Sequence, residues 1–246
     1  FHISKGGNNN IFIDPPKGTI FSESSEIIIF ITHGHPEHLG GVLDLVRNER
    51  RKQRIQIIAS KTVIRYLERE NRNNHITFLD VDSGYKNELT PNFSFEVFSW
   101  RHMPLLPPGF KAAIRHIIHI IMNFPAAWRI IRMSLKGPKG AGEMLGYLLH
   151  LSGNKNIIIY GEGLHRNCRV EDVTVIGQKA PGATLLVASE PEDIDELPGL
   201  VAASGAAEAI IYEPHRPWRD IFKLPHIDLK RLQQKIAKYG ITVKIT

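Results

Sequence analysis

The 246-residue sequence contains a single cysteine, Cys168, so no disulfide bond can form within the chain, and this suits a reducing compartment. It has no run of about 18 apolar residues, which excludes an uninterrupted hydrophobic membrane-spanning helix. No secretory signal peptide is recognisable. These absences predict a cytoplasmic protein.

The motifs of several large enzyme classes are also missing. The sequence has no Gly-rich loop of the Walker or dinucleotide type, which argues against nucleoside triphosphate and NAD chemistry. It has no Gly-x-Ser-x-Gly motif, and Cys168 has no recognisable catalytic partner nearby. Nucleophilic catalysis by serine or cysteine is therefore not expected.

The composition fits an ordinary globular enzyme. Apolar residues make up 42% of the chain and charged residues 23%, which is enough for one sizeable core. No repeat and no linker-like segment divides the sequence, so we expect a single domain over residues 1–246. The net charge of +6 favours an anionic partner, and leaves open whether this is a small substrate, a nucleic acid or a lipid surface.

Apolar patterning predicts alternating strands and helices. The expected strands are 10–13, 27–31, 55–59, 76–81, 93–99, 144–151, 156–160, 183–188, 208–212 and 241–245. The expected helices are 39–50, 61–70, 196–207 and 228–239. With hairpins expected at 76–99 and 144–160, this order predicts an α+β fold in which helices cover mixed sheets.

An isoleucine-rich segment at 105–142 interrupts this order and is interpreted as a helical insertion. Its helical part, 112–133, contains Pro125, which should break or kink it into two helices. Three roles stay open: a lid over a cleft, a surface for homo-oligomerisation, or an interfacial helix that contacts a membrane. The alternative is a helical hairpin that simply packs on the core.

The most informative segment follows the apolar strand 27–31. It reads Thr-His-Gly-His-Pro-Glu-His-Leu-Gly-Gly and places His33, His35, Glu37 and His38 within six positions. Imidazole nitrogens and carboxylate oxygens are the ligands that zinc, iron and manganese prefer. A loop that presents four such groups directly after a buried strand predicts a metal site.

The order His33-Gly-His35-Pro-Glu37-His38 resembles the His-x-His-x-Asp-His signature of the metallo-β-lactamase superfamily. The hydrophobic strand before it and the Leu-Gly-Gly after it match the surroundings of that signature. Three later residues match as well: His102 in Ser-Trp-Arg-His, Glu162 in Tyr-Gly-Glu-Gly and His215 in Glu-Pro-His. The resemblance implies an αββα sandwich of two mixed sheets flanked by helices.

The same resemblance implies a set of metal ligands. One ion would be held by His33, His35 and His102, and a second by Glu37, His38 and His215, with Glu162 as the bridge. The superfamily usually carries aspartate where this chain has Glu37 and Glu162. We therefore expect one or two Zn²⁺ ions, and keep Mn²⁺ or Fe²⁺ as alternatives because glutamate changes the reach of the carboxylates.

Further residues are assigned to catalysis or support. Glu37 and His165 are candidate catalytic residues, although His165 is interpreted equally well as a histidine of a surface loop. Asp14 lies where the superfamily commonly has a strand-end aspartate, and would orient a ligand histidine; a turn-forming aspartate is the alternative. Arg101 and Arg216 stand beside His102 and His215 and would attract a phosphate or carboxylate group, unless they are solvated.

The resemblance implies a metal-dependent hydrolase that uses a metal-bound hydroxide. Its loose similarity to the ascorbate-phosphate lactonase and N-acyl-phosphatidylethanolamine phosphodiesterase branch favours a phosphodiester or lactone substrate. One alternative is a metallo-nuclease, which the basic charge favours and the lack of a separate nucleic-acid module opposes. The other is a non-catalytic binding or assembly protein in which the two glutamates mark a degenerate site.

Overall fold

The computed structural model describes residues 1–4, 9–21, 26–48, 52–102, 107, 109–125, 127–128, 132, 138, 140 and 142–246. The predicted second helix of the insertion, around Trp128, Ile130 and Ile131, lies largely outside these residues. The chain divides into two compact units. We call Phe1–Tyr85 with Ile130–Leu145 the N-terminal unit, and Lys86–Arg129 with Gly146–Thr246 the C-terminal unit.

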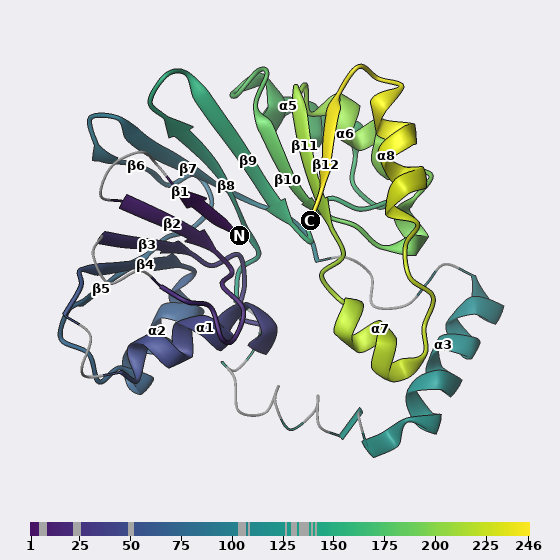
Figure 1. Ribbon diagram of the computed structural model, residues 1–246, viewed down its shortest axis with the longest axis horizontal. Helices are drawn as coiled ribbons and strands as arrows, with labels where there is room; N and C mark the ends of the chain where they lie inside the picture. Colours follow the sequence, from purple (N-terminus) through teal and green to yellow (C-terminus); the bar gives the residue numbers. More distant parts are fainter. Residues whose placement is uncertain are drawn as a thin grey trace. The chain divides into compact units, whose positions relative to one another are not determined.

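The N-terminal unit is built on a five-stranded sheet in the order β1-β2-β3-β4-β5 (Figure 1). Its strands are β1 (His2–Ser4), β2 (Asn9–Ile13), β3 (Glu26–Phe30), β4 (Ile55–Ala59) and β5 (Ile76–Asp80). All neighbours pair in parallel except β1 and β2. Helices α1 (Pro36–Val46) and α2 (Lys61–Glu70) bury their apolar sides in one cluster with Ile27 and Ile29 of β3 and with β4. Ile28 and Phe30 on the other face of β3 are buried too, which explains the continuous apolar run of this strand.

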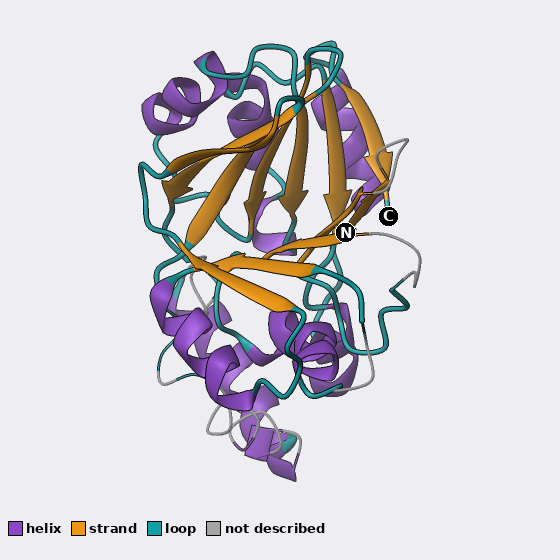
Figure 2. Ribbon diagram, turned by 90° about the vertical axis from the view of Figure 1, so that its left-hand side faces the viewer, coloured by secondary structure: helices purple, strands orange, loops and turns teal. Residues whose placement is uncertain are grey.

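The C-terminal unit contains a seven-stranded sheet in the order β12-β11-β10-β9-β8-β7-β6, whose arrows are seen in Figure 2. Its strands are β6 (Lys86–Thr90), β7 (Phe93–Ser99), β8 (Leu145–Leu151), β9 (Lys155–Gly161), β10 (Thr184–Ala188), β11 (Glu208–Tyr212) and β12 (Thr242–Ile245). Strands β9 to β12 are parallel, whereas β8 and β9 form an antiparallel hairpin. The carboxyl ends of β9, β10 and β11 therefore meet at one edge of the sheet.

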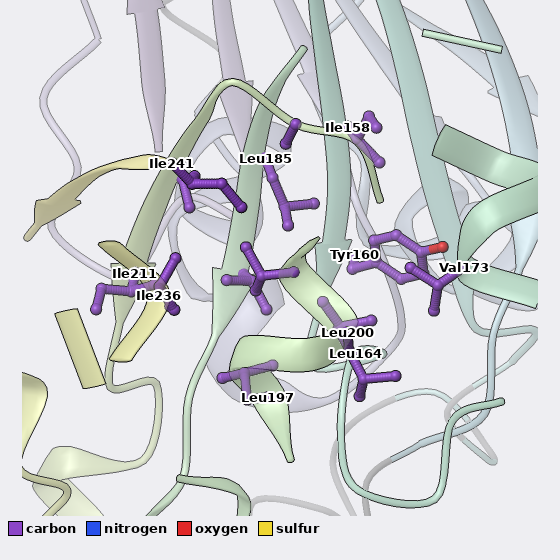
Figure 3. Packing of buried hydrophobic residues seen from close by; sticks show 14 of the residues in the cluster. Ile158, Tyr160, Leu164, Val173, Leu185, Leu197, Leu200, Ile211, Ile236 and Ile241 are labelled. Carbon is purple, nitrogen blue, oxygen red and sulfur yellow. The ribbon is translucent and has the colours of Figure 1, made fainter. Parts of the chain in front are cut away.

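Helices cover one face of this sheet. They are α5 (Val170–Gln178), α6 (Leu197–Ala203) and α8 (Leu229–Ala237). Val173, Leu200 and Ile236 of these helices belong to one buried cluster with Ile158 and Leu185 of the sheet (Figure 3). The short helices η1 (Pro191–Asp193) and α7 (Arg216–Phe222) follow β10 and β11. Helix α3 (Phe110–Met122) has no buried residue. No helix in the described ranges is long and apolar enough to cross a membrane.

The predicted fold class is confirmed, since the molecule consists of two mixed sheets with flanking helices. The predicted hairpin at 76–99 is wrong, because β5 pairs in parallel with β4 and the antiparallel partner of β7 is β6. A turn at 82–85 thus connects two different sheets. The first helix of the insertion, Phe110–Met122, ends before Pro125, as predicted from the break at this proline.

Candidate metal centre

The histidine loop, residues 33–38, lies in the N-terminal unit between β3 and α1. Pro36 occupies the first turn of α1, where its missing N–H costs no hydrogen bond, and His35 is the N-cap residue with an extended backbone. His33 is fully buried, His38 is nearly so, and His35 and Glu37 are half-buried. The abrupt change from strand to helix therefore concentrates these side chains at the carboxyl end of β3.

Asp14 orients two histidines of this loop. Its carboxylate accepts hydrogen bonds from the Thr32 main-chain N–H (2.8 Å) and the Thr32 hydroxyl (2.7 Å), and lies 3.0 Å from Nδ1 of His38. Since the Thr32 hydroxyl gives its proton to Asp14, it accepts from Nδ1 of His33 at 2.9 Å. Both imidazoles then carry their proton on Nδ1 and their lone pair on Nε2, the state of a metal ligand.

The backbone conformation around Asp14 helps to place its carboxylate beside Thr32 and His38. Asp14 has a φ of 43°, in the left-handed region that aspartate tolerates better than most residues. The Gly41 main-chain N–H donates to the carbonyl oxygen of Pro15 (3.1 Å), and a Cβ at Gly41 would lie 2.6 Å from the carbonyl oxygen of Pro16. Only glycine lets α1 approach the turn so closely, which explains the glycine in the Leu-Gly-Gly that follows the loop.

A second cluster of potential ligands lies in the C-terminal unit. His102 follows β7, Glu162 follows β9 and His215 follows β11, and we call these three residues the Glu162 cluster. The carboxylate of Glu162 is fully buried, with one oxygen 3.3 Å from Nε2 of His102 and the other 3.3 Å from Nε2 of His215. Two imidazoles thus face opposite oxygens of one buried carboxylate.

His215 also contacts a carboxylate that was not predicted from the sequence. Its Nδ1 lies 2.7 Å from Glu190, which follows β10 and is itself buried. Glu190 pairs with the buried guanidinium of Arg219, whose Nε lies 2.7 Å away. Burial lowers the pKa of His215, but the hydrogen bonds with Glu162 and Glu190 outweigh it and raise that pKa to about 10.

Close packing holds the segment that carries His102 against the segment that carries Glu162. A Cβ at Gly163 would lie 2.4 Å from the Trp100 ring, so the segment after β9 contacts the segment after β7 only with glycine at this position. His165 adds a second tie, since its Nε2 lies 2.9 Å from the carbonyl oxygen of Arg101. Both contacts fix the chain on either side of His102 and Glu162.

His165 is buried rather than placed on a surface loop. Its Nδ1 accepts the main-chain N–H of Asn167 at 3.2 Å, so Nε2 carries the proton and donates to Arg101. Burial lowers the pKa of His165 and keeps it neutral. With both ring nitrogens bound to the main chain, we expect His165 to position His102, and its predicted catalytic role stays untested.

The remaining predicted residues are at the surface or partly so. Arg101 and Arg216 have exposed side chains, and Glu37 lies half-buried in the first turn of α1. The buried guanidinium belongs instead to Arg219, one helical turn after His215. Two signals could have pointed to these residues: Arg219 lies four residues after His215, and Glu190 lies two residues after the predicted strand 183–188.

The donor atoms in each unit fit a zinc-sized ion. Tetrahedral zinc holds imidazole nitrogens at about 2.0–2.1 Å, which sets neighbouring ligand atoms roughly 3.3 Å apart. In the histidine loop, Nε2 of His33 lies 3.1 Å from Nδ1 of His35. In the Glu162 cluster, both nitrogen–oxygen separations are 3.3 Å. These groups are of the kinds that bind zinc, and their separations, which are also those of hydrogen bonds, are compatible with a shared ion.

Comparison with solved structures identifies the fold. The chain is similar to the metallo-β-lactamase fold protein YhfI from Bacillus subtilis, with a TM-score of 0.62 and 10% identity over 98% of this chain and 86% of that one. It is also similar to a protein of Parabacteroides distasonis provisionally assigned as a metal-dependent hydrolase (0.55, 13% identity, 97% and 84% covered). The Zn²⁺-bound PqqB from Methylobacterium extorquens is a third match (0.55, 14% identity, 99% and 84% covered).

These matches define the class of the molecule: it has the metallo-β-lactamase fold. No protein-family model matches the sequence, and no curated protein matches it either. At identities of 10–14%, the similarity establishes the fold and leaves the activity to be argued from the site.

Proposed function

We propose that this protein is a metal-dependent hydrolase whose proposed metal ligands are the histidines and glutamates of the metallo-β-lactamase-like motifs. His33 and His35 would supply two imidazoles, and His102 and Glu162 would complete a four-ligand set, each residue offering one ligand atom. The observation that carries the proposal is the buried carboxylate of Glu162 with an imidazole Nε2 at 3.3 Å from each oxygen. One carboxylate and two imidazoles that face one another are a set of donors that zinc, manganese and iron bind.

The residues behind the ligands support the same role. Asp14 contacts Nδ1 of His38, and Glu190 contacts Nδ1 of His215. In both histidines, Nε2 is then the atom that would bind a metal. Two oxygens on Glu162 suit a bridging position, so His38 and His215, with Glu37, remain the proposed ligands of a second ion. A bound divalent ion would supply a Lewis acid and a water molecule of lowered pKa.

A cavity in the C-terminal unit supports a proposal about one group of the substrate. It has a volume of about 180 Å³ and is bordered by His215 and Glu190, and its apolar wall consists of Pro107, Ile120, Trp218, Phe222 and Leu224. Its charged residues already pair with each other, Arg219 with Glu190 and Arg166 with Asp193. The cavity therefore suits an apolar group about the size of an aromatic ring.

We accordingly propose a phosphodiester or lactone that carries an apolar substituent. The substituent would occupy the cavity, and the bond to be hydrolysed would lie beside His215. His116, which burial keeps neutral by lowering its pKa, borders the same cavity from α3 and would contact the substituent.

The test joins metal analysis with hydrolysis. Protein purified without chelator is assayed for bound Zn, Mn and Fe, and for hydrolysis of bis-p-nitrophenyl phosphate and of an aromatic lactone. We expect bound metal, a lower melting temperature in EDTA, and hydrolysis that His35→Ala abolishes while the exposed His75→Ala retains it. Absence of metal together with an unchanged melting temperature in EDTA would refute the proposal.

A further inference from the structure

Helix α3 presents a large apolar surface to solvent. None of its residues is buried, and its exposed fractions reach 80% at Phe110, 64% at Ile121 and 77% at Met122. Beyond its end, Phe124 (61%) and Trp128 (47%) are exposed too. Soluble proteins seldom expose so many large apolar side chains together, and such a surface marks an interaction site.

The two sides of α3 have different roles. His116 and Ile120 point to the cavity of the C-terminal unit, where α3 lies beside α7 and away from the sheet (Figure 1). The exposed side carries Ile114, Ile117, Ile118 and Ile121, which follow helical spacing on one face. The contact of α3 with the rest of the C-terminal unit therefore leaves a continuous apolar face of the helix exposed.

Positive charge borders this face. Lys111 and Arg115 lie one turn apart at the edge of the isoleucine face, and both are exposed. In sequence, residues 101–142 hold seven lysines and arginines and no aspartate or glutamate. The rest of the chain carries 24 lysines and arginines against 25 aspartates and glutamates, so the whole positive excess of the protein lies in this segment.

We propose that the exposed face of α3 binds the surface of an anionic lipid bilayer. A helix with isoleucines and a phenylalanine on one side and basic residues at its border lies in the plane of the headgroups, with its apolar side in the acyl boundary. The basic residues are attracted by the negative surface potential of anionic lipids. At 13 residues, or about 20 Å, α3 is too short to span the roughly 30 Å hydrocarbon core, so it binds in the plane.

A bilayer explains the combination of features better than the other occupants. Nucleic acid would require the basic residues and gains nothing from a row of isoleucines. A second copy of the chain would bring another segment 101–142 with the same excess of positive charge, and the two would repel each other. Only an anionic surface with an apolar interior is complementary to both the charge and the apolar face.

The test measures co-sedimentation of the full chain with phosphatidylcholine vesicles, with and without phosphatidylglycerol. We expect binding that requires phosphatidylglycerol and weakens with salt. Lys111→Gln with Arg115→Gln should weaken it about thirtyfold, and Ile117→Asp with Ile121→Asp about a hundredfold or more. All four positions are exposed, so the variants should keep the melting temperature of the wild type.

Matched controls lie on other helices of the same unit. Val170→Asp with Val175→Asp replaces residues of α5 that are 51% and 57% exposed, and Lys230→Gln with Arg231→Gln removes the same charge from α8. Both controls should bind vesicles like the wild type. Vesicle binding has no hydrolysis readout, so its failure leaves the metal proposal intact.

Three results would overturn the proposal. The first is no binding to vesicles with phosphatidylglycerol at low salt. The second is unchanged binding by the Ile117→Asp, Ile121→Asp variant. The third is a protein that does not bind vesicles but forms a complex with a polynucleotide, or forms a dimer that the Ile117→Asp, Ile121→Asp variant dissociates.

Discussion

The two units of the molecule supply potential metal ligands in different ways. In the N-terminal unit, His33, His35, Glu37 and His38 come from one loop between β3 and α1. In the C-terminal unit, His102, Glu162 and His215 follow three different strands. The first set depends on local sequence alone, whereas the second exists only because the sheet brings the ends of distant strands together.

Both units orient a histidine in the same way. A carboxylate holds the Nδ1 side of a histidine in each unit, Asp14 for His38 and Glu190 for His215. The carboxylates differ in how they are fixed: Asp14 binds Thr32 and lies in a left-handed turn, while Glu190 is paired with the buried Arg219. The comparison shows that orientation of an imidazole can rest on a main-chain turn or on a buried ion pair.

This difference predicts that the C-terminal carboxylate matters most for stability. Glu190→Ala leaves the buried guanidinium of Arg219 without its main partner and should cost about 3–5 kcal/mol of unfolding free energy. Urea unfolding measures this. Glu192→Ala is the control, because it removes only the second contact of Arg219 (2.9 Å), and equal losses in both variants would contradict the assignment.

A second variant tests the packing that joins His102 to Glu162. Gly163→Ala would push a Cβ into the Trp100 ring and should cost about 2 kcal/mol, together with some loss of bound metal. Gly199→Ala is the matched control: it lies in α6 with open space around it, and should stabilise the fold by about 0.5–1 kcal/mol. If Gly163→Ala and Gly199→Ala change the melting temperature equally, the close contact between residue 163 and Trp100 is unimportant for stability.

The smallest effect is expected in the N-terminal unit. Asp14→Asn keeps a residue that tolerates the left-handed backbone but loses the charged acceptor for Nδ1 of His38. Metal affinity, measured by competition with a chelator, should fall about tenfold with little change in stability. Asp44→Asn, on the exposed side of α1, should leave the affinity unchanged, and the account is wrong if the two variants bind metal equally well.

The contrast between the units also explains what could be predicted from the sequence. The histidine loop was recognisable because its residues are neighbours in the chain and follow an apolar strand. Glu190 and Arg219 were missed, because a carboxylate and a guanidinium become partners only when β10 and α7 are placed side by side. The prediction of a hairpin at 76–99 failed for a similar reason: apolar alternation identifies strands β5 and β7 but not the neighbours with which they pair.

The central claim is the proposal that the protein binds a metal ion and that His35 and Glu162 are among its ligands. The most direct test is the metal content of three proteins after dialysis: the wild type, His35→Ala from the N-terminal unit and Glu162→Ala from the C-terminal unit. We predict that the wild type retains metal and that each variant loses the same ion. Retention of the full metal content by either variant would show that the replaced residue is not a ligand and contradict the account.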